Sequence, residues 1–126
     1  TMEQIIKVKD RPVWFDSLDG WDGGSWDDAV KFCDGHGGRE LCLYPTYCPY
    51  GEGKAVMGGH RYDFDAEGEQ WAPVYGETNH WVMIGQKYMN RATTCMDSQE
   101  LEGAMPDWGT SGENANAKRH IMCCKF

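Results

Sequence analysis

The chain has few aliphatic side chains and no long hydrophobic segment. Only 18 of its 126 residues are Leu, Ile, Val or Phe, a share that by itself is typical of disordered chains. No run approaches the roughly 18 consecutive apolar residues of a membrane-spanning helix, so no membrane span is predicted. Six Trp, six Tyr and seven Met stand in for the missing aliphatics, and each buried aromatic ring removes about 150–250 Å² from water. The composition therefore predicts an aromatic core.

Positive charge is also scarce. The chain has 12 Lys and Arg against 20 Asp and Glu, which gives a formal net charge of −8. Nucleic acids and anionic membranes require a basic surface, so neither is an expected partner. The acidic surplus is typical of a solvated surface, and a bound cation or a basic partner is the alternative interpretation.

The motifs of common enzyme classes do not occur in the sequence. There is no G-x-S-x-G, no H-E-x-x-H and no phosphate-binding glycine loop. The four His residues are dispersed, and His80 and His120 border expected strands, where a structural hydrogen bond is the commoner role. The sequence therefore predicts a protein that is not an enzyme and has no catalytic residues.

The cysteines lack the C-x-x-C spacing of zinc sites. An even number without that spacing predicts disulfides, formed by Cys33, Cys42, Cys48, Cys95, Cys123 and Cys124. The alternative is a zinc site built from His120, Cys123 and Cys124 with one of His36, His60 or His80.

Cys123 and Cys124 are consecutive in "RHIMCCKF", which is typical of a closing strand. Successive strand residues point to opposite faces, so the two sulfurs should reach different partners. Fifteen pairings are possible. We expect one of these two cysteines to bond Cys33, the other to bond Cys95, and a local clip to join Cys42 and Cys48.

Disulfides require an oxidising compartment, which predicts a secreted, extracellular or cell-surface protein. No hydrophobic segment of a signal peptide is visible. In a secreted protein, Thr1 would then be a mature terminus or the edge of an excised domain.

The clearest local signal is a helix that begins in "SWDDAVKFC". Ser25 is expected to cap it, with Asp28 as the partner in a capping box. Three further residues, Ala29, Val30 and Cys33, fall on one face with Trp26, so the helix should pack through the side that carries its cysteine.

The other elements follow from alternation and turn residues. In order, we expect a strand over residues 4–15 ended or broken by Pro12, a strand over 39–44, a loop over 45–53, a central strand over 80–88, polar loops over 97–118 and a closing strand over 119–126. This pattern predicts a single α+β domain over residues 1–126. One main helix would pack on short antiparallel strands with long disulfide-tied loops.

Several of these stretches resemble a C-type-lectin-like domain. They are "W…SWDDAVKFCDGHGGREL", which is similar to the opening of that fold, "WVMIG", which is similar to its core strand, and "HIMCC", which is similar to its closing strand. The set "GRELC…CP…GG…WAPV…NHWV.IG…C…P.WG…RHIMCC" is also similar to uncharacterised cysteine-containing modules of secreted algal proteins. The resemblance implies a helix cysteine bonded to the terminal strand, in agreement with the pairing expected for Cys33.

The resemblance also implies a candidate binding site. The calcium-dependent sugar site of that family uses a Q-P-D or E-P-N triplet, a later acidic residue and a W-N-D tripeptide. Here "MPDW" and "GEN" match part of it, with Met105 in place of the first ligand and no W-N-D. The implied ligand-binding residues are Asp107, Trp108, Glu113 and Asn114, with Pro106 beside them.

A second candidate cation site lies in "DFDAEGE". Asp63, Asp65 and Glu67 occupy the first, third and fifth positions of an EF-hand-like loop, although Val74 stands where the bidentate Glu is required. Ca²⁺ is therefore a candidate ligand and no other cofactor is expected. An acidic solvated loop is the alternative interpretation.

Two functions are compatible with these features. The first is a non-catalytic, secreted recognition or adhesion module whose partner is a glycan or an extracellular protein. The second is a structural subunit that forms a homo-oligomer or filament by adding its N-terminal strand to the sheet edge of a neighbour. Tyr44, Tyr47 and Tyr50 could give a stacking surface for a partner, and packing within the core or loops is the alternative.

Overall fold

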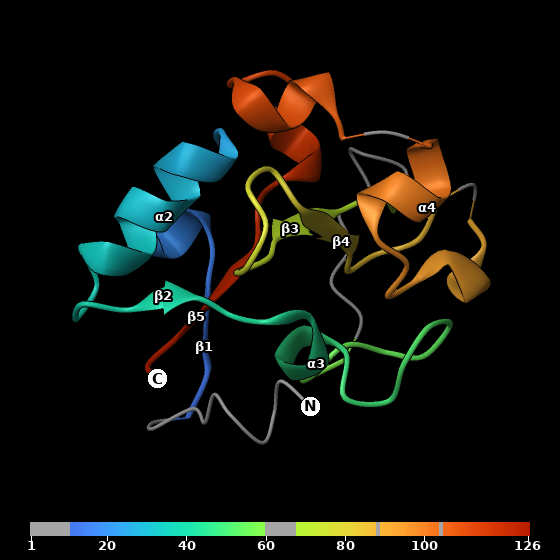
Figure 1. The fold of residues 1–126 in the computed structure, drawn as a ribbon, viewed down its shortest axis with the longest axis horizontal. Coiled ribbons are helices and arrows are strands. Elements are labelled where there is room, and N and C mark those ends of the chain that lie inside the picture. The colour runs from blue at the N-terminus through green and yellow to red at the C-terminus, as the bar shows by residue number, and fades with distance from the viewer. Residues whose placement is uncertain (1–10, 60–67, 88, 104) are drawn as a thin grey trace.

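The computed structural model describes residues 11–59, 68–87, 89–103 and 105–126. The first described strand, β1 (Val13–Phe15), pairs antiparallel with the last, β5 (Ile121–Cys124). β2 (Glu40–Leu41) pairs antiparallel with the other side of β5. β5 is therefore the centre of a three-stranded sheet, with all four residues buried (Figure 1).

The main helix, α2 (Trp26–Asp34), begins where its sequence predicts. The Ser25 hydroxyl accepts the backbone N–H of Asp28 at 3.0 Å, and the Asp28 carboxylate accepts the Ser25 N–H at 3.1 Å. These two bonds satisfy backbone groups that the helix end leaves unpaired. Ala29 and Cys33 are buried, and the helix lies against β2 and β5 (Figure 1). The predicted cap and the predicted buried face are both confirmed.

A second sheet is the hairpin of β3 (Trp71–Pro73) and β4 (Trp81–Met83). The predicted central strand over residues 80–88 is therefore too long. It ends at Met83 because the N–H groups of Ile84 and Gly85 both donate to the Gln70 carbonyl, at 2.8 and 3.3 Å, which ends one-to-one pairing. Beyond the hairpin, β4 makes one isolated bridge, between Val82 and Asp97. The central strand of the larger sheet is β5 instead.

Short helical turns connect these strands. They are η1 (Ser17–Asp19), α3 (Tyr44–Tyr47), η3 (Arg91–Thr93), α4 (Ser98–Glu102), η4 (Asp107–Thr110) and η5 (Ala115–Ala117). The prediction of a loop over residues 45–53 is wrong at its start, because Pro45 fits the first turn of α3. In the first predicted strand, residues 4–10 lie outside the described ranges, and β1 starts after Pro12. Among the described residues, no helix is long and apolar enough to cross a membrane.

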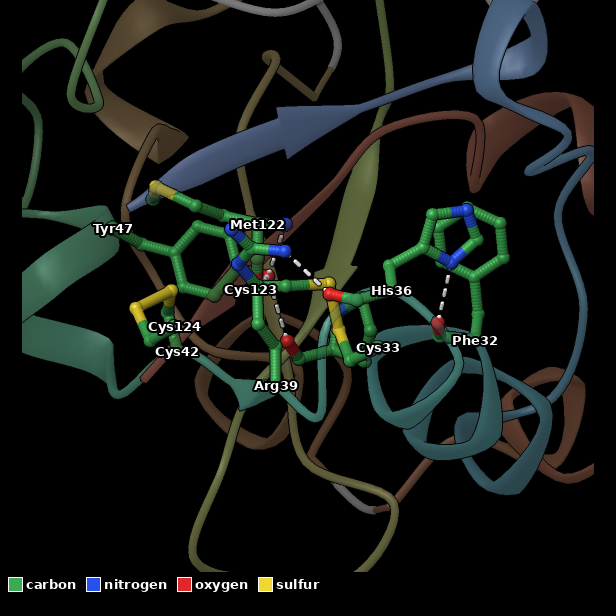
Figure 2. The surroundings of a disulfide bond; sticks show 10 residues. Phe32, Cys33, His36, Arg39, Cys42, Tyr47, Met122, Cys123 and Cys124 are labelled. Atoms are coloured by element: carbon green, nitrogen blue, oxygen red, sulfur yellow. Dashed lines mark hydrogen bonds between the residues drawn. A yellow bond between two sulfur atoms is a disulfide. The ribbon is translucent and has the colours of Figure 1, made fainter. Parts of the chain in front are cut away.

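Two disulfides join β5 to segments on its two sides. Cys123 bonds Cys33 of α2, and Cys124 bonds Cys42 (Figure 2). The prediction that the two consecutive sulfurs reach different partners is confirmed, as is the bond between Cys33 and the closing strand. The third disulfide joins Cys48 to Cys95.

Two predicted pairings are wrong, namely the bond from the closing strand to Cys95 and the clip between Cys42 and Cys48. β2 pairs with β5 in a register that sets Glu40 opposite Cys124, and the N–H of Cys42 donates to the Met122 carbonyl at 3.1 Å. This register brings Cys42 to Cys124. The helix α3 then separates Cys48 from Cys42, so Cys48 is free to reach Cys95.

Aromatic side chains fill much of the interior, as the composition predicts. Tyr47 of α3 is fully buried and packs edge-to-face against Trp14, with ring centroids 5.7 Å apart. Its hydroxyl lies 2.9 Å from the Pro73 carbonyl oxygen and accepts the backbone N–H of Met122 at 3.0 Å. One side chain thus connects α3 with both sheets, and burial raises its pKa well above the ordinary value.

The disulfide pairing is testable by peptide mapping without reduction. Trypsin cleaves after Lys and Arg, which gives cysteine peptides 32–39, 40–54, 92–118 and 120–125. The observed pairing joins all four peptides into one species, because peptide 40–54 bonds both 120–125 and 92–118. We expect mass spectrometry to find that species. A separate, internally bonded peptide 40–54 would show the clip between Cys42 and Cys48 instead.

Candidate functional site

The segment over residues 105–118, here named the docked loop, carries the four residues that the resemblance implies. It follows α4, contains η4 and η5, and leads into β5. In Figure 1 it lies above the β3–β4 hairpin and beside the N-terminal half of α2. Asp107, Glu113 and Asn114 are exposed, whereas Trp108 is half-buried. The structure thus places three polar candidates on the surface of one loop.

Trp108 anchors the docked loop to the hairpin. Its ring centroid lies 5.3 Å from that of Trp71 and 5.2 Å from that of Trp81, in tilted arrangements, and both of these partners are fully buried. Its indole Nε1 donates to the Glu102 carboxylate at 3.1 Å. Glu102 in turn bonds Lys87 at 3.0 Å. The ring faces and the indole N–H are largely engaged within the protein, so packing is the main role visible for this residue.

Asn79 holds the start of the docked loop. Its side chain donates to the Pro106 carbonyl at 2.8 Å and accepts the Trp81 indole N–H at 2.7 Å. Gly109 lies directly against this pair, since a Cβ there would be 2.0 Å from Asn79 Oδ1 and 2.3 Å from Trp81 Nε1. The close approach of the loop backbone to the hairpin therefore requires glycine at this position.

Lys118, the last residue of the docked loop, bonds through its side chain to the backbone near the middle of the loop. The side chain is fully buried, and its Nζ donates to the carbonyls of Trp108 at 2.7 Å and Ser111 at 3.0 Å. Nζ also lies 5.5 Å from the Trp81 ring centroid and 5.8 Å from that of Trp108. Burial lowers the pKa of Lys118 to about 8, and the carboxylates of Asp28 and Glu113 oppose this shift.

Gln70, immediately before β3, fixes the end of the docked loop. It is fully buried, donates from Nε2 to the Asn116 carbonyl at 2.5 Å, and accepts the Arg119 N–H through Oε1 at 3.0 Å. Asn79, Lys118 and Gln70 therefore use buried polar side chains to pair backbone groups of the loop that no strand pairs.

The structure gives no metal centre to the described residues. Across residues 11–59, 68–87, 89–103 and 105–126, no three His, Cys, Asp or Glu side chains gather as a metal site requires. Asp107, Glu113 and Asn114 offer three side-chain donors, fewer than the six to eight oxygens that Ca²⁺ prefers. The EF-hand-like candidates Asp63, Asp65 and Glu67 lie outside the described ranges.

The zinc alternative is wrong because all six cysteines are in disulfides. His36 Nδ1 is instead 2.8 Å from the Phe32 carbonyl oxygen, and its ring stacks on the Phe32 ring (Figure 2). His80 Nε2 is 3.7 Å from an Asp97 carboxylate oxygen. His60 lies outside the described residues.

The proposed stacking surface of three tyrosines is not formed. Tyr47 is buried, and the Tyr44 hydroxyl donates to the Cys95 carbonyl at 2.6 Å, whereas Tyr50 is 74% exposed. The packing alternative holds for Tyr47, and only Tyr50 projects freely into solvent.

Two acidic residues form a cluster beside Tyr44 that the sequence does not indicate. Burial raises the pKa of Glu100, and a hydrogen bond with Glu52 raises it further. Burial also raises the pKa of Tyr44, with a smaller contribution from Glu52. Glu52 and Glu100 are far apart in the chain and meet beside Tyr44, whose hydroxyl donates to the Cys95 carbonyl. No local pattern indicates this cluster, because the predicted pairing placed Cys48 elsewhere.

Comparison with known proteins gives a family without an assigned role. Residues 13–126 match the family model described as a domain of unknown function, DUF7495. Searches of the curated proteins and of the solved structures find no match. The matched range includes both sheets, the three disulfides and the docked loop.

Docking of the loop is testable with two glycine substitutions. We expect Gly109→Ala to lower the free energy of unfolding by about 1–3 kcal/mol, because the new methyl group displaces Asn79 or Trp81. Gly112→Ala is the matched control, since nothing lies within 4 Å of the Cβ position there; its effect should stay within about 0.5 kcal/mol. Chemical denaturation followed by Trp fluorescence measures both. Equal effects would contradict the close approach at Gly109.

Lys118 should make stability rise with pH in a mildly alkaline window. Its pKa is lowered to about 8 in the folded protein, so between that value and the ordinary value near 10.4 the unfolded chain binds more protons. The free energy of unfolding should therefore rise by at most about 1.4 kcal/mol per pH unit. Above about pH 10 the raised pKa of Tyr47 acts in the opposite direction.

The measurement is a series of denaturation curves from pH 7.5 to 9.5 on the wild type and on Lys118→Met. The difference in unfolding free energy between the two proteins isolates Lys118 from other titrating groups. A difference that stays flat over this window would contradict a lowered pKa.

Proposed function

The chain belongs to the DUF7495 family, and we propose that it is a non-catalytic extracellular recognition or adhesion domain of the C-type-lectin-like type. The docked loop is its ligand-binding surface. Glycans are the proposed ligand class, and an extracellular protein is the alternative partner.

Two features of the architecture support a C-type-lectin-like identity. The first and last described strands pair with each other, and the main helix is bonded to the closing strand through Cys33 and Cys123. The sequence resemblance implies the second of these features. A long loop with little regular structure then covers a small Trp-rich hairpin, as in a fold that displays its ligand-binding groups on loops.

Three disulfides support an extracellular location, because such bonds persist in oxidising compartments. The net charge of −8 supports a surface that remains well solvated and does not bind nucleic acid.

The observation that carries the proposal is how the docked loop is held. Its backbone is fixed by the buried side chains of Asn79, Lys118 and Gln70, while Asp107 and Glu113 remain exposed. Polar groups on a fixed backbone bind with a smaller loss of conformational entropy than groups on a mobile one. Carboxylates accept hydrogen bonds from sugar hydroxyls, and an amide side chain both accepts and donates them. The donors do not complete a calcium shell, so no binding step here depends on Ca²⁺.

A glycan array tests this function. We expect the wild type to bind a restricted set of glycans, and the double variant Asp107→Ala/Glu113→Ala to lose at least tenfold in signal. Asp34→Ala/Glu77→Ala is the control, because it removes two exposed carboxylates outside the docked loop. The signal should persist in EDTA. A flat array for the wild type with and without Ca²⁺ would remove the glycan proposal.

The second candidate, a structural subunit of an extracellular assembly, is favoured by one observation. Among the described strands, β1 lies at the edge of its sheet, since the order is β1-β5-β2, and an edge strand can pair with another chain. Light scattering on native material separates the candidates. A single small species supports a recognition domain, whereas concentration-dependent assembly supports the subunit.

A further inference from the structure

We propose that Lys118 is the positioning residue of the docked loop, and that its side-chain nitrogen fixes the backbone of residues 108–111 in the conformation that displays Asp107 and Glu113. The role in display rests on the proposed function. The positioning itself rests on geometry alone and is tested separately.

Trp108 and Gly109 fix η4 against the hairpin, but the backbone hydrogen bonds of the loop do not fix η4 relative to η5. These backbone hydrogen bonds join residues three apart, from Gly109 to Pro106, Ala117 to Asn114 and Lys118 to Ala115. Such bonds shape single turns and do not join one turn to another. Lys118 follows η5 directly. Its Nζ donates to the Trp108 carbonyl in η4 at 2.7 Å and to the Ser111 carbonyl just after η4 at 3.0 Å. It therefore connects the two turns, η4 and η5, that the backbone leaves independent.

The backbone on either side of this side chain is itself fixed. The Lys118 carbonyl accepts the Trp21 indole N–H at 2.8 Å, from a Trp that is almost fully buried between η1 and α2. The next residue, Arg119, donates its N–H to Gln70. The backbone of Lys118 is thus fixed against the core. Its ammonium therefore donates to the Trp108 and Ser111 carbonyls from a fixed position.

The surroundings of the ammonium allow its hydrogen bonds to be separated experimentally from the space that the side chain fills. The Trp81 and Trp108 rings lie within 6 Å of Nζ and favour a cation, as do the carboxylates of Asp28 on α2 and Glu113 on the loop. A methionine at position 118 has a similar length and could occupy the same space between the rings. It has no N–H to donate, so both carbonyls would lose their partner.

The test is ¹⁵N relaxation of the backbone amides in wild type and Lys118→Met. We expect order parameters of residues 109–116 to fall from about 0.85, typical of rigid backbone, to below about 0.6. Amides of α2, β4 and β5 should keep wild-type values. Lys31→Met is the matched control, because Lys31 is exposed on α2, and it should leave the loop unchanged.

Two results would overturn the proposal. One is a rigid loop in Lys118→Met, and the other is a loss of order spread evenly over the whole domain. If that variant fails to fold, hydrogen exchange of the side-chain ammonium in the wild type decides. Slow exchange at Lys118 relative to Lys31 supports the proposal, and equal rates reject it.

The glycan array distinguishes this inference from the proposed function. Loop order that depends on Lys118, together with a flat array, leaves the positioning role intact and removes glycan recognition. Glycan binding that is equal in wild type and Lys118→Met, with a rigid loop in both, supports recognition and rejects the positioning role.

Discussion

The structure depends on two consecutive cysteines in its central strand. Because side chains alternate along a strand, Cys123 and Cys124 point to opposite faces of β5, where one bonds α2 and the other bonds the segment after β2. These bonds span 90 and 82 residues. In the chain-entropy model, closing one loop of this length stabilises the folded state by about 4–5 kcal/mol, because the unfolded chain loses conformational entropy. A chain with only 18 Leu, Ile, Val and Phe residues thus gains by cross-linking what it lacks in aliphatic burial.

In the second half of the chain, hydrogen bonds from buried polar side chains fix the backbone in place of disulfides. Asn79, Gln70 and Lys118 each bond at least one backbone group of the docked loop, so a stretch without strands keeps one conformation. Trp108 adds ring contacts to the same hairpin. Such an arrangement is stable only when every buried polar group has its partner. These contacts with the hairpin therefore order the loop, which is not a flexible connection.

The proposed recognition function follows from this division between held and exposed groups. The side chains that fix the loop face inward, while Asp107, Glu113 and Asn114 face solvent. Asn114 adopts a left-handed conformation, with a φ of 59°, at the start of η5. Asn tolerates this conformation better than most residues.

The sequence by itself determined the features that depend on near neighbours in the chain. The cap of α2 at Ser25 and Asp28, the buried face through Ala29 and Cys33, and the opposite directions of Cys123 and Cys124 all follow from helix and strand geometry. The α+β class with one main helix follows from the same patterns.

Only the tertiary structure decided the partners of Cys42 and Cys48, because these depend on the register of β2 against β5 and on the turn made by α3. It also decided that Lys118 is buried between Trp rings while Asp107 is exposed. Both are charged residues in a polar stretch without strands, and local propensity does not tell which of them is buried against the hairpin.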